Sequence, residues 1–520
     1  MLEAIAQVKG AFDVYCASKR PRLFLLTFVL LLVGCSACSP TTNTITATPT
    51  PIPAYTIPGG GDCVKLSQHV QAPFANVRVS HDSYLAHSEP MLAENPKNPL
   101  NLVGGSKFFT DPTHYKFQIG YFDSFDGGCT WTDGGVLPGF EKNETTSDIS
   151  FAFDNHNDVY AAVLYEKDGA KGGSGIAVLT STDGGKTFGN PVSVFEARAD
   201  QVFSDKPWIA VDQTDGPFSG YIYVVWSYDH NGTCGGINNC SEELAFSRST
   251  DGGKTFSPIS LVEGNAPFCT NPATGRPVGS TKCDAAQGAI PAVGPDGTLY
   301  VATPYIDVMS GPIPTRLLVT SSTDGGKDWT TPVLIATIHD ISGAFPPEKY
   351  RNLSLPAFAC DLHTGQLYLT WSDKGTRDAD ILFSTSKDHG QTWSVPFRVN
   401  DDPIGNGANQ FQPQMAVAPG GVVSISFFDT RNDPRHRWID VYMAQSVDHG
   451  ASFLKNVRVT PQSWDPAVDA SVDEYGSQFI GDYQGLAVDD RFAHPFWNDT
   501  RTGAQEIFTA AVRGAQPKIP

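Results

Sequence analysis

Apolar residues along this chain fall in short runs that are separated by clusters of Gly, Pro, Asn and Asp. Few stretches show the 3.6-residue periodicity of an amphipathic helix, so the pattern predicts strands and turns. A run such as PWIAVD at 207–212 is followed by a second run rich in Tyr, Val and Trp, such as GYIYVVW at 220–226. Two more strands are predicted near 243–249 and 257–262. The recurring unit therefore has four strands.

The first strand of this unit occurs seven times, and the last copy lacks a fourth strand of its own. In the seventh unit the second and third strands are expected at 492–499 and 505–512. The segment ANVRVS at 75–80 matches NVRVT at 456–460, which is the fourth strand of unit six, so we expect it to complete unit seven. Closed radial repetition of four-stranded sheets is a β-propeller. We predict an all-β, seven-bladed β-propeller over 74–520; the alternative is six blades and one decorative unit. The seven first strands lie at 90–95, 149–154, 207–212, 290–295, 355–360, 413–418 and 485–490.

An octapeptide between the third and fourth strands is repeated in six of the seven units. Its Asp, such as Asp183, can accept hydrogen bonds from the N–H groups of its own turn, and Gly184 and Gly185 permit positive φ. Each copy supplies one carboxylate followed by Gly or His, too few oxygens for a calcium loop, and lacks the glycine spacing of a phosphate loop. We therefore expect a structural turn that binds no metal and no cofactor. The copies lie at 124–131, 181–188, 249–256, 322–329, 386–393 and 446–453.

The repeat, written S-x-D-x-G-x-[TS]-[WF], resembles the Asp-box (BNR repeat) of the sialidase superfamily, over most of the chain. The resemblance implies exo-glycoside hydrolysis by a Tyr nucleophile and an acid/base carboxyl, with three Arg gripping a sugar carboxylate. Two features depart from the family. Its propellers have six blades, and its first Arg stands in a Phe-Arg-Ile-Pro-like motif. The nearest candidate here is Arg78, which lacks the Pro and is expected on an outer strand.

Strand order predicts which face would bind a ligand. The second-to-third and blade-to-blade connections emerge on one face and contain the long segments, whereas the octapeptides emerge on the other. Polar residues precede the first strands on the long-loop face and would ring the mouth of the central channel; alternatively, they cap strands and bond between blades. With the resemblance, the candidate catalytic residues are Tyr483, Asp482, Asp205 and Glu89, and candidate substrate-binding residues are Lys206, Arg351 and Gln412. Asp148 and Gln287 belong to the same ring.

A second set of polar residues follows three successive second strands in a [WF]-x-D…R pattern. The Asp–Arg pairs are Asp373 with Arg377, Asp429 with Arg431, and Asp499 with Arg501. Repetition in successive blades favours a structural Asp–Arg clasp. The alternative is that Arg377, Arg431 and Arg501 converge on a substrate carboxylate, which suits bidentate guanidinium geometry. An acid opens each following third strand, at Asp380, Asp440 and Glu506.

The N-terminal segment indicates export. Three basic residues precede an apolar run at 23–33, which is too short to span a bilayer and is typical of a signal peptide. Leu32-Val33-Gly34-Cys35 resembles the bacterial lipobox, so we expect a lipoprotein-type signal peptide at 1–34 and lipidation of Cys35; the alternative is an ordinary secretory signal or a short anchor. The Thr/Pro-rich stretch at 35–73 is typical of an extended tether. We expect an exported lipoprotein on the outer side of the bacterial cell membrane.

Charge and cysteine content limit the partners. The formal net charge is −19, which disfavours nucleic acid. Export permits disulfides, and we expect Cys234–Cys240 and Cys269–Cys283 to pair; zinc is the alternative, but no CxxC supports it. We predict a monomeric, surface-anchored, sialidase-like propeller acting on extracellular glycans, as a glycoside hydrolase of the exo-sialidase kind. The alternative is a non-catalytic propeller that binds a glycan or a surface protein.

Overall fold

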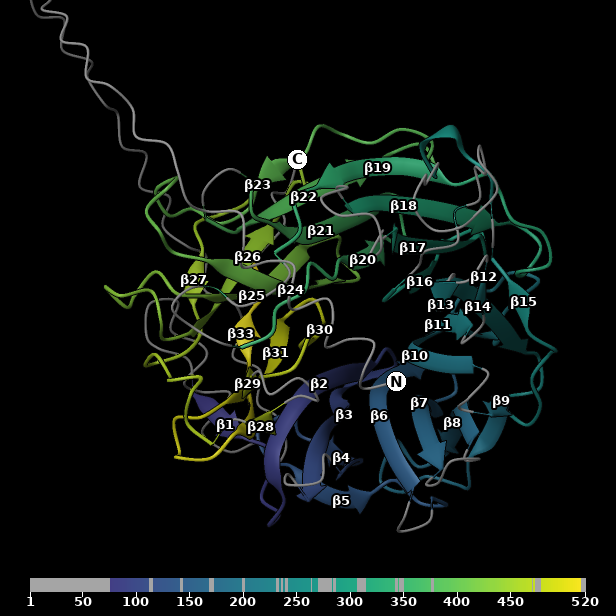
Figure 1. The fold of residues 1–520 in the computed structure, drawn as a ribbon, viewed down its shortest axis with the longest axis horizontal. Helices are drawn as coiled ribbons and strands as arrows, with labels where there is room; N and C mark the ends of the chain where they lie inside the picture. The colour runs from purple at the N-terminus through teal and green to yellow at the C-terminus, as the bar shows by residue number, and fades with distance from the viewer. Residues whose placement is uncertain are drawn as a thin grey trace, which may run out of the picture. The chain divides into compact units, whose positions relative to one another are not determined.

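The chain folds into seven antiparallel sheets arranged as blades around a central axis (Figure 1). The seven-bladed, all-β prediction is therefore confirmed, and the inner strand of each blade contacts the inner strand of the next, including the last with the first. Among the described residues, no helix is long and apolar enough to cross a membrane. The computed structural model describes residues 75–515 except 112–115, 141–143, 168–172, 199–201, 231–232, 235–236, 239–241, 263, 270–282, 284–286, 306–314, 342–344, 346–349, 376–377, 470 and 473–477.

The first and second strands of the blades correspond to the predicted apolar runs. The inner strands are β2 (Leu85–Asn95), β6 (Glu144–Phe153), β10 (Val202–Val211), β16 (Ile290–Val293), β20 (Ala357–Cys360), β24 (Gln410–Val417) and β30 (Gly485–Val488). The second strands are β3 (Asn98–Asp111), β7 (Val159–Lys167), β11 (Ile222–His230), β17 (Leu299–Tyr305), β21 (Leu367–Asp373), β25 (Val423–Asp429) and β31 (Phe492–Asp499).

The third and fourth strands complete each blade. The third strands are β4 (Lys116–Ser124), β8 (Gly173–Ser181), β14 (Glu242–Ser249), β18 (Thr315–Ser322), β22 (Asp380–Ser386), β26 (Asp440–Ser446) and β32 (Glu506–Ala510). The fourth strands are β5 (Thr132–Val136), β9 (Val192–Arg198), β15 (Ser260–Leu261), β19 (Val333–Ile338), β23 (Phe397–Arg398), β27 (Val457–Arg458) and β1 (Asn76–Arg78). The short β33 (Val512–Arg513) also pairs with β31. The connections contain two small hairpins, β12 (Thr233–Cys234) with β13 (Ile237–Asn238) and β28 (Ser471–Val472) with β29 (Gln478–Phe479), and the 3-10 helix η2 (Pro267–Cys269).

The N-terminal strand closes the ring, as the sequence predicts. β1 pairs antiparallel with β32, where Asn76 faces Ala510 and Arg78 faces Phe508. The Arg78 guanidinium donates to the Glu506 carboxylate at 2.5 Å. Because this pair lies on the two outer strands of blade 7, Arg78 is remote from the inner strands that line the channel.

The octapeptide turn of one blade packs against the neighbouring blade. In blade 2 the Asp183 carboxylate accepts a hydrogen bond from the Thr187 N–H at 3.0 Å, and Gly184 and Gly185 have φ of 76° and 93°. A Cβ on Gly185 would come within 2.2 Å of the Val103 side chain in blade 1, and the Asn101 amide donates to the Gly184 carbonyl at 2.9 Å. The turn is therefore a joint between blades, as its local chemistry predicts.

The cysteine predictions are tested only in part. Cys269 and Cys283 form the expected disulfide, and Cys129 is also disulfide-bonded. Cys360 is a free, half-buried thiol, and burial raises its pKa to about 12. The proposed Cys234–Cys240 pair, the signal peptide, Cys35 and the tether all lie outside the described residues or side chains.

Candidate functional site

Four inner strands carry the same β-bulge at the channel, and each bulge presents a polar residue. The pairing register shifts between Ser88 and Met91 in β2, and the same shift recurs in β6, β10 and β24. The residues in the bulges have φ close to 50°, in the left-handed region that non-glycine residues rarely adopt. Bulges re-aim side chains, and such backbone strain gathers at functional sites. The four residues are Glu89, Asp148, Lys206 and Gln412.

Asp482 of blade 7 forms a buried ion-pair network with two basic residues. The Arg351 guanidinium grips its carboxylate through Nε at 3.0 Å and Nη2 at 2.6 Å, and the Lys206 Nζ donates to Oδ2 at 3.0 Å. Burial alone would raise the pKa of Asp482, but Lys206 and Arg351 hold it at about 2. The predicted Asp482, Lys206 and Arg351, from three different blades, are thus brought together, with Asp482 as a permanent carboxylate.

Tyr483 has Asp148 as its partner. The phenol donates a hydrogen bond to Asp148 Oδ1 at 3.1 Å, and the same oxygen lies 3.6 Å from Lys206 Nζ. Burial opposes ionisation of Asp148, but Lys206 and Lys107 hold its pKa below the ordinary value. Burial, Asp148 and Glu89 raise the pKa of Tyr483 well above its ordinary value, so its phenol is neutral.

Glu89 is paired with a residue that sequence reasoning missed. Lys107 Nζ in β3 lies 2.7 Å from Glu89 Oε2, and it also lies 4.4 Å from the ring centroid of Phe479. Burial raises the pKa of Glu89 above its ordinary value, against the effect of Lys107. A lysine within the apolar run of a second strand was the available signal, because a fully buried lysine is almost always paired.

Asp205 is more exposed than the other three acids described above. Its residue is partly exposed, whereas Glu89, Asp148 and Asp482 are buried. Burial of the carboxyl raises the pKa of Asp205 to about 7, with Lys206 opposing the shift and Asp148 adding to it. These seven side chains, which we call the channel cluster, are Glu89, Lys107, Asp148, Asp205, Lys206, Arg351 and Asp482.

Gln412 lies in the fourth bulge and contacts backbone instead of joining the ion pairs. Its amide donates to the Gly481 carbonyl of blade 7 at 2.6 Å. Gln287 precedes Gly288, which has a φ of 72° at the start of blade 4, and its backbone N–H donates to the Pro304 carbonyl. Within the described residues, no group of three or more His, Cys, Asp or Glu side chains could hold a metal ion.

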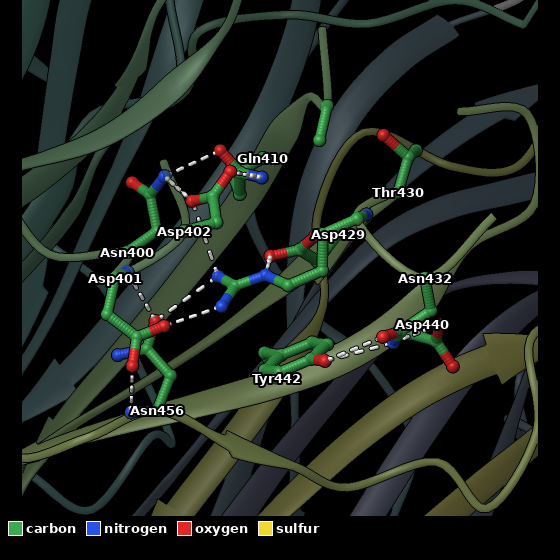
Figure 2. Close-up of polar contacts among 12 residues, drawn as sticks. Asn400, Asp401, Asp402, Gln410, Asp429, Thr430, Asn432, Asp440, Tyr442 and Asn456 are labelled. Atoms are coloured by element: carbon green, nitrogen blue, oxygen red, sulfur yellow. Dashed lines mark hydrogen bonds and ion pairs between the residues drawn. The ribbon is translucent and has the colours of Figure 1, made fainter. Parts of the chain in front are cut away.

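The second predicted set forms clasps within blades. In blade 6 the Arg431 guanidinium donates to Asp429 at 2.7 Å and to Asp401 at 2.5 Å, and it stacks 4.3 Å from the Tyr442 ring centroid. Figure 2 shows Asp401 and Asn456 side by side, with the Tyr442 ring next to the clasp. Burial raises the pKa of Asp429 to about 6, against the effect of Arg431.

Blade 7 repeats this clasp. Arg501 pairs with Asp499, donates to Asn76 Oδ1 at 2.7 Å and stacks 4.7 Å from the Phe508 ring centroid. Asn76 precedes the Val-Arg of β1 as Asn456 precedes that of β27, so the two clasps are equivalent. Arg431 and Arg501 are therefore engaged in separate blades and do not converge. Arg377 lies outside the described residues.

Comparisons with known proteins found structural likenesses at low sequence identity. No family model and no curated protein matches the sequence. A solved protein of unknown function from Dyadobacter fermentans is 13% identical, with a TM-score of 0.46 over 73% of this chain and 98% of that chain. A Hadza microbial sialidase is 14% identical, with a TM-score of 0.40 over 80% and 75%. A GH93 α-L-arabinofuranosidase of Fusarium graminearum is 13% identical, with a TM-score of 0.43 over 69% and 92%. Likenesses of this size concern the fold alone.

Proposed function

We propose that this chain is a glycan-acting hydrolase whose reaction centre is the channel cluster and whose general acid is Asp205. The observation that carries this proposal is the contrast between the partly exposed Asp205, with a pKa of about 7, and Asp148, where, despite burial, Lys206 and Lys107 hold the pKa below its ordinary value. Carboxyls held in opposite protonation states in one site are the arrangement that acid-catalysed glycoside cleavage requires. Near pH 6, Asp205 retains its proton while Asp148 stays ionised.

Exposure supports Asp205 over Glu89 as the acid. Glu89 is 1% exposed and its carboxylate lies against Lys107, so a substrate oxygen would have to displace that pair. Phe203 lies two positions before Asp205 in β10 and is 38% exposed. Because alternate strand residues share a face, this ring would flank Asp205 and offer an apolar surface to a sugar.

In this proposal Tyr483 is the nucleophile and Asp148 is its base. Asp205 gives its proton to the glycosidic oxygen as the bond to the anomeric carbon breaks. The Tyr483 oxygen bonds to that carbon and its proton passes to Asp148, the acceptor of its hydrogen bond at 3.1 Å. Water then attacks the carbon and yields a proton to Asp205, while the phenol leaves with the proton from Asp148. Since the Tyr483 pKa is high, its proton must move as the new bond forms.

The narrower exo-sialidase form would need three Arg around a substrate carboxylate. Arg351 is bound bidentately to Asp482, and Arg431 and Arg501 are held in clasps in separate blades. We therefore propose a glycosidase whose substrate does not depend on a carboxylate. The proposal keeps the expected setting, an exported protein anchored through Cys35 and acting on extracellular glycans.

The test is turnover by the purified full chain and by Asp205→Asn. Substrates are fluorogenic arabinofuranosides, hexosides and sialosides and a panel of polysaccharides, read by fluorescence and by reducing ends. We expect wild-type activity to persist below about pH 7 and to fall as Asp205 loses its proton above it. Asp205→Asn should lower kcat by about 10²–10⁴-fold, the usual contribution of a general acid.

The matched control is Asp215→Asn, the same substitution at an exposed residue between β10 and β11 of the same blade. It should retain full activity, and both variants should unfold at the wild-type temperature. Turnover that survives Asp205→Asn would refute the assignment of the acid. Glycan binding without turnover by the wild type would refute the hydrolase and support the non-catalytic alternative.

A further inference from the structure

A hollow on the loop face is lined by none of the channel cluster. It is a cleft of about 680 Å³ between blades 6 and 7. Its walls come from the β25–β26 loop, the connection from β27 to β28 and the start of the β31–β32 loop. This volume falls within the range of about 300–1,000 Å³ that is usual for small-molecule sites.

An exposed tryptophan forms one wall of the cleft on a fixed backbone. Trp438 is 41% exposed. The Asp433 carboxylate beneath it accepts hydrogen bonds from the N–H groups of Arg435 at 3.2 Å, Arg437 at 3.0 Å and Trp438 at 3.1 Å. Burial opposes ionisation, but these backbone donors hold the pKa of Asp433 below its ordinary value. The backbone that carries the indole is therefore fixed, and the Arg435 guanidinium lies 6.0 Å from the centroid of its ring.

A buried donor lies on the segment beside Trp438, since Ile439 and Trp464 exchange backbone hydrogen bonds at 2.9 Å. Trp464 is 1% exposed, packs 5.4 Å from the Phe428 ring centroid and lines the cleft. Its indole N–H has no hydrogen-bond acceptor among the described residues. Three other buried indole N–H groups also lack an acceptor among the described residues, those of Trp226, Trp329 and Trp371. This donor therefore supports a ligand only together with the cleft beside it.

The two arginines that line the cleft, Arg458 and Arg501, are paired with carboxylates of the chain. Arg458 donates to Asp440 at 2.9 and 2.7 Å and to Ser463 at 3.1 Å. Arg501 is held by Asp499 and Asn76. Because these guanidinium groups already have carboxylate partners, the cleft lacks the unpaired cations that would favour an anion. Its chemistry suits a ligand that is uncharged and rich in hydroxyls.

We propose that this cleft binds neutral sugar units of a polysaccharide, with the apolar C–H face of a pyranose stacked on Trp438. Hydroxyl groups at the edge of the ring would bond to the polar wall, including the exposed Gln462. A flat apolar face with a polar edge matches an exposed indole beside polar groups. This binding does not depend on the proposed hydrolysis in the channel.

The test is affinity electrophoresis of the purified full chain in gels that contain dextran, a mixed-linkage β-glucan, xylan or polygalacturonate. We expect at least one neutral polysaccharide to retard the wild type. Trp438→Ala should raise the dissociation constant at least tenfold, and Trp438→Phe, which keeps a ring, should retain part of the affinity. Trp438→Ala should turn over the small fluorogenic substrates at the wild-type rate, which separates the cleft from the channel.

The matched control is Phe125→Ala, which removes a ring of similar exposure, 39%, from the octapeptide turn of blade 1. It should bind as the wild type does, and all variants should unfold at the same temperature. The proposal fails if no neutral polysaccharide retards the wild type, or if polygalacturonate alone does so. It also fails if Trp438→Ala and Phe125→Ala have equal effects.

Discussion

The channel cluster and the two Asp–Arg clasps are made of the same chemical groups but differ in how they repeat. The clasp of blade 6 recurs in blade 7, with Arg431 replaced by Arg501 and Asn456 replaced by Asn76. The four bulges at the channel share one backbone geometry yet carry four different residues. A group of side chains that recurs in successive blades, such as the clasp, stabilises the structure of the blade. Different side chains on the same repeated backbone geometry indicate that they were selected for binding or catalysis and not for folding.

The two regions also differ in range and strain. Each clasp Arg pairs with an Asp two residues before it and with an Asn at the fourth strand of its own blade, Asn456 or Asn76. The channel cluster instead joins blades 1, 2, 3 and 7 to one another. Three of its residues, Glu89, Asp148 and Lys206, have φ in the left-handed region. Strain that is kept at a site of several buried charges points to function more than to stability.

The largest expected effect is that of Lys206→Met. Its ammonium is the shared counterion of Asp482 and Asp148, and although burial opposes its charge, these carboxylates raise the pKa of Lys206 well above its ordinary value. Removing one partner of a buried ion pair typically costs about 3–5 kcal/mol, because the other charge stays buried. We expect a loss of this size in the free energy of unfolding in urea, together with loss of turnover.

The double variant Lys206→Met with Asp482→Asn is the control for that loss. It removes both charges of the 3.0 Å pair, so it should recover part of the stability that Lys206→Met loses. If the double variant is as unstable as the sum of the two single variants, the pair does not act as a unit. The comparison between the two regions would then lose its energetic basis.

A smaller effect is expected from Arg431→Ala. Its partner Asp429 is fully buried, so the variant leaves that carboxyl without its main donor, at a cost of about 2 kcal/mol. The pKa of Asp429, already raised by burial to about 6, should rise further, and the carboxyl should take up a proton. Turnover at pH 6 should stay at the wild-type level. Loss of turnover without loss of stability would contradict the structural role of Arg431 and indicate that it contacts the substrate.

Repetition also explains how much of the fold could be predicted. Seven copies of one apolar run, and the match between 75–80 and 456–460, predicted the blades and the strand that closes them. The octapeptide predicted its own hydrogen bonds, because these lie within eight residues. Local pattern and local chemistry suffice where contacts are local or repeat with the blade.

The sequence predicted which residues belong to the candidate site but not which of them contact one another. Strand order placed Glu89, Asp205, Lys206 and Asp482 near the channel mouth, but it did not pair Tyr483 with Asp148. That contact joins residues of blades 2 and 7, and only the closed ring brings them together. Lys107 was missed because it lies on a second strand, whereas the prediction considered residues that precede first strands.

The smallest predicted effect is a difference in sign between two glutamines of β24. Gln412 lies in the bulge with a φ of 49°, whereas Gln410, beside the clasp, lies in the strand outside the left-handed region. Replacement of Gln412 by Gly should leave the protein about 1 kcal/mol more stable than replacement by Ala, because Ala pays the left-handed strain. At Gln410 the order should reverse by about 0.5–1 kcal/mol, since Gly only adds backbone entropy there. Both pairs of variants lose the glutamine side chain equally, so urea unfolding of the four reports the backbone alone. If Gly and Ala rank in the same order at the two positions, the bulge is not strained. Backbone strain would then give no reason to place function at the channel.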